Sequence, residues 1–253
     1  MKIIGKGLAA LCIAGAAACG SGRPARQAPP PDAKRVDPAT AGAISGNVRF
    51  DGLVLASGPA KLDSDPNCAR EHPDGLLPDN MVLNNGGLEN VFVYVKDGVG
   101  GYYFDAPSQP VKLDQKGCRY IPHVLGVQVG QPLEISNSDA TVHNVHGMAK
   151  ANREFNYSQP LQNLKNTTTF TAPEVMVHFK CNVHGWMEAY VGVLPHPYFA
   201  VTAAGGAFEL KQLPPGTYTI EAWHEKLGTQ TQSVTVAPKE SKTITFIFKA
   251  ASS

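Results

Sequence analysis

Short strand-like runs separated by turn signals recur through most of this 253-residue chain. Apolar, β-branched and aromatic residues cluster or alternate over a few positions, as in Val91–Val95, between residues that favour turns. The chain contains 25 glycines and 20 prolines, and we find no convincing helical pattern. Runs that return roughly every 8–12 residues are typical of β-sandwiches. We therefore expect an all-β protein in which the least regular part, residues 147–165, forms a loop or a short helical turn.

Two short segments carry side chains with the chemistry of a metal site. Cys181, His184 and Met187 lie within seven residues, and His143 precedes Cys181 by 38 residues. Thiolate and thioether are soft ligands that suit Cu(I), and two His, one Cys and a weak Met ligand bind copper in electron-transfer sites. Zinc is the alternative metal, but structural zinc usually has four strong N or S ligands. The pattern predicts one copper ion per chain.

The first 18 residues have the features of an export signal. Two lysines form a basic start, and the apolar core that follows is too short to span a bilayer comfortably. Small residues then precede Cys19, as at the lipid-attachment site of bacterial lipoproteins, although Ala16 stands where Leu is usual. We expect residues 1–18 to be a signal peptide and Cys19 to carry lipid. The protein would then be exported and anchored to the membrane by lipid only, in the periplasm or at the cell surface; an ordinary cleaved signal peptide is the alternative.

The segment that follows the signal has the composition of a tether. Residues 19–41 are rich in Pro, Ala and Arg, which is typical of a disordered or extended linker. The net charge of the whole chain is only +1, and no long basic run appears. Nothing in the sequence therefore indicates nucleic acid as a partner.

The five cysteines can be assigned by their positions. Cys12 lies in the signal, Cys19 would carry lipid, and Cys181 is the candidate ligand. Cys68 and Cys118 remain, and disulfides persist in exported proteins. We expect these two to form a disulfide; two buried free thiols are the alternative.

The middle of the chain resembles the cupredoxin family of copper proteins. The resemblance rests on Asn137 followed by the pair His143-Asn144, and on Cys181-Asn-Val-His184 after a strand-like run. It implies a Greek-key β-sandwich in which His143, Cys181 and His184 are the equatorial copper ligands. It also implies that Asn144 holds the ligand loops together, and that a partly exposed His184 is the port for electrons.

The identity of the axial ligand stays open in the sequence. Met187 is closer to His184 than the corresponding Met is in most plastocyanin-like proteins, so the match is loose here. We take Met187 as the fourth ligand. His146 is the alternative or an additional ligand, because it lies only three residues after His143.

The flanks resemble a carboxypeptidase regulatory-like domain, a transthyretin-like β-sandwich with a carbohydrate-binding-like fold. The resemblance rests on Gly-Ala-Ile-Ser-Gly-Asn-Val at residues 42–48 and on Leu-Pro-Pro-Gly-Thr-Tyr at residues 213–218. We expect residues 42–105 and 195–250 to form one sandwich, with the cupredoxin domain at residues 106–194 inserted between its parts. Two sequential domains are the alternative.

Together these features imply a copper protein that carries single electrons to or from a redox partner protein. The chain has no Gly-x-Ser-x-Gly, no His-Glu-x-x-His and no Gly-rich phosphate loop, so we do not expect an enzyme. Two other functions remain open. One is a sandwich that binds carbohydrate or protein around a structural metal, and the other is a copper chaperone.

Overall fold

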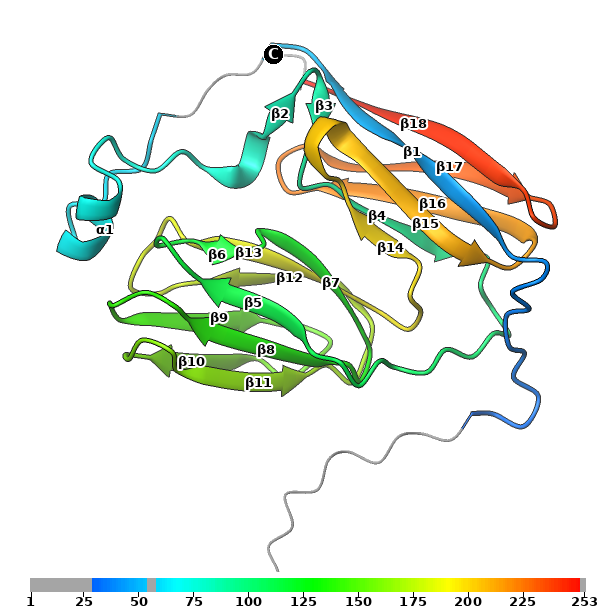
Figure 1. Ribbon diagram of the computed structural model, residues 1–253, viewed down its shortest axis with the longest axis horizontal. Coiled ribbons are helices and arrows are strands. Elements are labelled where there is room, and N and C mark those ends of the chain that lie inside the picture. Colours follow the sequence, from blue (N-terminus) through cyan, green and yellow to red (C-terminus); the bar gives the residue numbers. More distant parts are fainter. Residues whose placement is uncertain (1–28, 54–57, 251–253) are drawn as a thin grey trace, which may run out of the picture.

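The computed structural model describes residues 29–53 and 58–250. Its strands form two β-sandwiches, one above the other in Figure 1, so the expected all-β fold is confirmed. The expected signal peptide, Cys12 and the lipidated Cys19 lie outside the described residues. Within the described residues, every helix is too short or too polar to span a bilayer.

The flanking sandwich combines segments from both sides of the middle domain. One sheet has the strand order β15-β1-β3-β2, with β18 pairing in parallel with β1, and the other has the order β14-β4-β16-β17. The middle domain is therefore inserted into this sandwich between β4 and β14. The strands are β1 (Gly42–Asp51), β2 (Leu83–Asn84), β3 (Gly87–Leu88), β4 (Phe92–Asp97), β14 (Phe199–Val201), β15 (Ala207–Leu213), β16 (Gly216–His224), β17 (Gly228–Val236) and β18 (Ser241–Lys249).

The middle sandwich places the two ligand segments side by side. One sheet has the order β10-β9-β12-β13-β7 and the other the order β11-β8-β5-β6. Because β9 and β12 are hydrogen-bonded neighbours, His143 at the start of β9 and Cys181 just after β12 meet at one end of the sheet. The strands are β5 (Val111–Gln115), β6 (Tyr120–Ile121), β7 (Val124–Gln128), β8 (Pro132–Asn137), β9 (His143–Met148), β10 (Phe155–Gln159), β11 (Lys165–Thr169), β12 (Glu174–Lys180) and β13 (Glu188–Leu194).

Strand β4 is apolar on both faces because it lies between two cores. Consecutive side chains of a strand point to opposite sides. Val93 and Val95 accordingly belong to the core of the flanking sandwich. Phe92 and Tyr94 belong to a separate cluster with Val124 and other residues of the middle sandwich. The continuous apolar run of β4 thus joins the two sandwiches.

A pair of glycines makes room for this contact. Gly126 of β7 and Gly192 of β13 are partners in the sheet. A Cβ atom on Gly192 would lie 2.3 Å from the ring of Phe92, and one on Gly126 would lie 2.4 Å from the ring of Phe199. The two phenylalanines stack, with ring centroids 5.7 Å apart. The two rings therefore pack directly on the backbone of Gly126 and Gly192, and this close contact holds the two sandwiches together.

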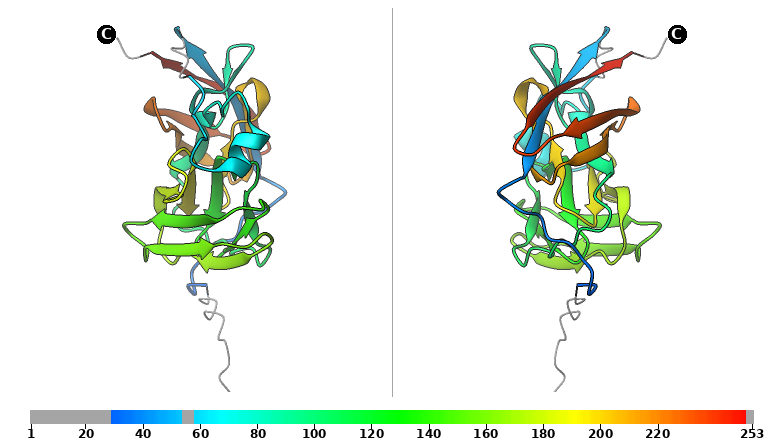
Figure 2. Two further views of the ribbon diagram at one scale, coloured as in Figure 1. Left: turned by 90° about the vertical axis from the view of Figure 1, so that its left-hand side faces the viewer. Right: turned by 90° about the vertical axis from the view of Figure 1, so that its right-hand side faces the viewer.

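A cap segment, residues 58–82, leaves the flanking sandwich between β1 and β2 and lies beside one end of the middle sandwich (Figures 1 and 2). It contains the helix α1 (Pro66–Glu71) and the short 3-10 helix η1 (Asp79–Met81); a second one, η2 (Ala204–Gly206), precedes β15. The expectation that the chain has no helix is therefore wrong at α1.

The start of α1 has a recognisable signal. The Asp65 side chain accepts hydrogen bonds from the backbone N–H groups of Asn67 and Cys68, and Pro66 occupies the first turn. Asp as the N-cap followed by Pro is a favoured helix start. The helix is too short to show an apolar repeat, so only the cap residues could have revealed it.

A disulfide ties the cap segment to the middle sandwich. It joins Cys68 of α1 to Cys118, which lies between β5 and β6. Leu62 and Leu76 of the cap segment pack around it in a small buried cluster. The cap segment is thus held both covalently and by apolar contact.

Residues 147–165 are more regular than expected. Strand β10 pairs with β9 along its whole length, so the expected loop or helical turn is wrong at Phe155–Gln159. The turn before it is ordered by Glu174, whose carboxylate accepts hydrogen bonds from three successive backbone N–H groups, those of residues 150–152.

The described part of the expected tether is bound at its C-terminal end. Lys34 exchanges backbone hydrogen bonds with Gly101 and Tyr103, each of 3.0 Å. Arg35 forms an ion pair of 2.7 Å with Asp105. Lys34 and Arg35 are therefore bound to the connection between β4 and β5, unlike the free tether expected for residues 19–41.

Replacing both disulfide cysteines, Cys68→Ser with Cys118→Ser, should lower the free energy of unfolding by about 3–4 kcal/mol, because the unfolded chain regains the freedom of a 50-residue loop. Urea unfolding of the metal-free protein measures this. Wild-type protein treated with a dithiol is the control and should unfold at the same urea concentration as the double variant. Equal midpoints for oxidised wild type and the double variant would contradict the prediction.

Gly192→Ala should destabilise the protein by about 1–3 kcal/mol, because the added methyl group overlaps the Phe92 ring and forces the sandwiches apart. Gly100→Ala is the control, since a Cβ atom there meets nothing within 4 Å. Thermal unfolding compares the two variants. The same melting temperature for both would show that the sandwiches tolerate a wider spacing.

Candidate metal centre

Three of the predicted ligand side chains converge where β9 and β12 meet. The thiol sulfur of Cys181 and one ring nitrogen from each of His143 and His184 lie within 4.8 Å of one another, and all three side chains are buried. The two Nδ1 atoms are 2.9 Å apart, and the sulfur lies 3.8 Å from Nδ1 of His184. The structure therefore brings together two imidazoles and a thiol that are up to 41 residues apart in sequence.

Each imidazole turns its other nitrogen toward a buried carboxylate. Nε2 of His143 lies 2.9 Å from Oδ2 of Asp139, and Nε2 of His184 lies 3.0 Å from Oδ2 of Asp65. An ionised carboxylate can only accept, so both Nε2 atoms donate. In its neutral form each ring then carries a lone pair on Nδ1, directed at the other ring and at the thiol.

Both carboxylates are held in their ionised form. Burial raises the pKa of Asp65, but hydrogen bonds from Thr141 and from the backbone of α1 bring it down to about 2. Burial also acts against the Asp139 charge, yet His143 and two backbone N–H groups lower its pKa below the usual range. Neither residue is predicted from the sequence, because neither belongs to a recognisable ligand spacing.

The space between the two Nδ1 atoms is built for a positive charge. Two lone pairs that face each other at 2.9 Å repel unless a proton or a metal cation lies between them. In the metal-free protein a proton fills this role: burial lowers the pKa of His143, but Asp139 and the Cys181 thiolate raise it to about 9. A metal cation would take the place of this proton, so the donor set fits a metal.

The thiol is also prepared to bind a cation. Burial raises the pKa of Cys181, but its contacts with the His143 ring and with the ring and backbone N–H of His184 outweigh this and lower the pKa to about 6. At neutral pH the side chain is therefore a thiolate, which is the form that binds metals. Cys181 is only 2% exposed, so its sulfur is shielded from solvent and from large substrates.

Backbone hydrogen bonds close the ligand loop. The Cys181 N–H donates to the carbonyl of Met187 at 3.1 Å, and the Met187 N–H donates to the carbonyl of His184 at 3.0 Å. The His184 N–H points at the Cys181 sulfur at 3.4 Å. Met187 is buried in the same core cluster as Cys181. The loop thus holds all three side chains in one compact turn.

Asn144 joins the ligand loop to β9. Its Oδ1 accepts a hydrogen bond of 2.7 Å from the Asn182 N–H and lies 3.4 Å from the Cys181 sulfur. Its Nδ2 donates to Asn156 of β10 at 2.7 Å, and Tyr120 donates to its backbone carbonyl at 2.6 Å. The Asn144 side chain therefore joins β10, the ligand loop and the thiol, while its backbone carbonyl is bound by Tyr120 of β6.

The structure does not bring His146 to the other candidate ligands. His146 is three residues from His143 on the same strand, and an odd spacing places the two side chains on opposite faces. Its ring contacts Glu154, and its Nδ1 lies 3.4 Å from Asn182. These contacts hold it on the outer face of β9, away from the buried cluster.

The expectation that His184 is partly exposed is wrong. His184 is only 1% exposed. Asp65 of the cap segment covers its Nε2 edge, and the ring of Trp186 lies beside it with centroids 4.9 Å apart. The Trp186 indole N–H is fixed by the carbonyl of Cys118 at 3.1 Å. The cap segment and Trp186 therefore close the side of the site that the resemblance expected to be open.

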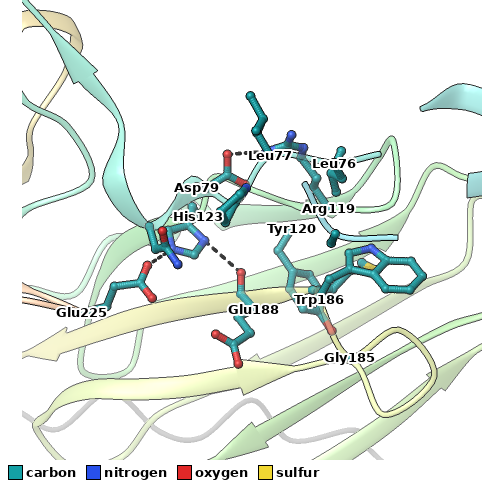
Figure 3. Close-up of a pocket in the computed structure, with 14 residues that line it drawn as sticks. Leu76, Leu77, Asp79, Arg119, Tyr120, His123, Gly185, Trp186, Glu188 and Glu225 are labelled. Atoms are coloured by element: carbon teal, nitrogen blue, oxygen red, sulfur yellow. Dashed lines mark hydrogen bonds and ion pairs between the residues drawn. The ribbon is translucent and has the colours of Figure 1, made fainter. Parts of the chain in front are cut away.

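A pocket of about 220 Å³ lies behind Trp186 and Met187, between the cap segment and the middle sandwich (Figure 3). On its rim Arg119 pairs with Asp79, and His123 pairs with Glu225. Because these side chains are paired with one another, neither pair is free to bind a ligand in the pocket.

The aromatic residues of the flanking sandwich are used in packing. Tyr218 is 1% exposed, and its hydroxyl donates to the carbonyl of Pro214. Trp223 packs on Tyr190, with ring centroids 5.0 Å apart, at the contact between the sandwiches. Tyr218 is therefore unavailable to a sugar, and Trp223 has a structural role.

One family model matches the chain, the carboxypeptidase regulatory-like domain, over residues 188–249. The match begins at β13 and runs to the last residue of β18, so the later part of the chain contains such a domain, as expected. No relative among curated proteins matches the chain.

Several solved structures are similar to part of the chain. A Cu-containing nitrite reductase from Thermus scotoductus SA-01 is 22% identical, with a TM-score of 0.32, over 38% of this chain and only 24% of its own. An amicyanin mutant in the Cu(I) state is 26% identical, with a TM-score of 0.30, over 33% of this chain and 81% of its own. A purple cupredoxin from Nitrosopumilus maritimus is 18% identical, with a TM-score of 0.29, over 33% of this chain and 98% of its own. With its two facing sheets and its ligand segments at the ends of neighbouring strands, the middle sandwich has a cupredoxin-like fold.

Proposed function

We propose that the protein binds one copper ion through His143, Cys181 and His184 and transfers single electrons with it. The observation that carries this proposal is the pair of inward-facing Nδ1 atoms, 2.9 Å apart, beside a buried thiolate. Copper at this position would supply one-electron chemistry, by alternating between Cu(I) and Cu(II). Thiolate and imidazole together suit both oxidation states.

The surroundings support electron transfer because they hold the donor atoms still. Carboxylates orient both imidazoles, backbone hydrogen bonds close the ligand loop, and Asn144 joins that loop to β9. Groups that orient metal ligands in this way also tune the metal. Donors that keep their positions in both oxidation states favour rapid exchange of electrons, since little rearrangement accompanies each transfer.

The closed site argues against the other functions considered from the sequence. A copper chaperone has to release its ion readily, whereas His184 lies under the cap segment and Trp186. A carbohydrate-binding module is not supported by Tyr218, which is packed. Structural zinc usually takes four strong N or S ligands, and the structure gathers three.

The proposal includes export, a lipid anchor at Cys19 and a redox partner protein. Export and the anchor rest on the sequence of residues 1–41. The disulfide between Cys68 and Cys118 supports an oxidising compartment, because such bonds persist outside the cytosol.

The purified full-length protein loaded with Cu(II) should show an intense visible thiolate charge-transfer band and an EPR signal from one copper per chain. Cys181→Ser should abolish the band and reversible one-electron cycling, because the thiolate is lost. Val183→Ala is the control in the same loop, since the Val183 side chain is 48% exposed. Reversible redox cycling in Cys181→Ser would sink the proposal.

Met187→Leu should alter the EPR parameters and the band positions while costing less than about 1.5 kcal/mol in stability, because volume is nearly conserved and only the thioether is removed. His146→Ala is the matched comparison and should leave the spectrum unchanged, because its ring contacts Glu154 on the outer face. The reverse pattern, with His146→Ala altering the spectrum and Met187→Leu silent, would assign the fourth ligand to His146.

A further inference from the structure

Asp65 reaches the site from a different part of the fold. It lies in the cap segment, which belongs to the loop between β1 and β2 of the flanking sandwich, 119 residues before His184. Its side chain is buried, with 7% exposure for the residue. A buried charge is retained only where it is paired and hydrogen-bonded, so the partners of Asp65 indicate what it does.

The two carboxylate oxygens of Asp65 have separate partners. Oδ1 accepts from the backbone N–H groups of Asn67 and Cys68, at 2.8 Å and 3.3 Å, and so caps α1. Oδ2 accepts from the hydroxyl of Thr141 at 2.6 Å and lies 3.0 Å from Nε2 of His184. One oxygen therefore anchors the side chain and the other faces the ligand ring.

We propose that Asp65 is a positioning residue, which holds the proton of His184 on Nε2 and so keeps the Nδ1 lone pair free for the metal. The flanking sandwich thereby contributes to the metal centre of the middle sandwich. The link to copper rests on the function proposed above, but the position of the proton does not.

The separate partners of the two Asp65 oxygens predict where the His184 proton lies when Asp65 is replaced. In Asp65→Asn the amide oxygen takes the Oδ1 place, because the N–H groups of α1 need an acceptor. The amide N–H₂ then faces Nε2 of His184 and donates to it. The ring proton moves to Nδ1, where it blocks the metal. In Asp65→Ser the serine also caps α1, but its side chain is too short to reach His184. The His184 proton then has no preference between Nδ1 and Nε2.

The position of the proton can be read in the metal-free protein. Nitrogen-15 NMR of the histidine rings, at a pH where His184 is neutral, should show Nε2–H in wild type, a mixture in Asp65→Ser and Nδ1–H in Asp65→Asn. Asp63→Asn is the control, because it removes a charge from the same segment at an exposed site. The Nε2–H form in all four proteins would overturn the proposal.

Copper affinity gives a second measurement. Competition with a chelator should show a loss of about tenfold or more in Cu(II) affinity for Asp65→Asn, a smaller loss for Asp65→Ser and none for Asp63→Asn. Equal losses for Asp65→Asn and Asp65→Ser would reduce Asp65 to a structural role and overturn the proposal. If wild type binds no copper, the proposed function fails, while the NMR series still decides the role of Asp65.

Discussion

The contact between each imidazole and a buried carboxylate is the constraint on which the rest of the site depends. Asp139 and Asp65 accept hydrogen bonds from the Nε2–H groups of His143 and His184, and this leaves both Nδ1 lone pairs pointing at one another across 2.9 Å. That arrangement is unstable without a positive charge between the rings. The neighbouring thiolate and the hydrogen-bonded ligand loop then surround a position that a proton holds in the metal-free protein and that the proposed metal would take.

The two sandwiches have unequal parts in this arrangement. The middle sandwich supplies the donors, because β9 and β12 are neighbours and both ligand segments lie at the same end of the sheet. The flanking sandwich supplies the cap segment, with its disulfide and Asp65, which shields His184 from water. If the site transfers electrons as proposed, they would have to pass by a route other than the solvent edge of His184, which is buried.

Local patterns in the sequence predicted the three side chains that converge, but not the contacts that the cap segment makes with them. Cys181, His184 and Met187 lie in one turn, so their spacing alone suggested a site, and alternation along the strands predicted an all-β fold. Asp65 was missed because 119 residues separate it from His184. The expected exposure of His184 was wrong because the resemblance covers only the middle domain, whereas the cap segment that covers His184 lies outside that domain.

The glycine pair beneath Phe92 and Phe199 has a consequence for how the chain can be divided. Removing residues 111–194 as a separate piece would leave Gly126 and Gly192 as a bare strip of backbone facing water, where two aromatic rings now lie. The same cut would discard Asp65 and half of the disulfide. An excised middle sandwich would keep Cys181 and both imidazoles, yet the Nε2 edge of His184 that Asp65 now covers would face water, so the insertion itself closes this side of the candidate site.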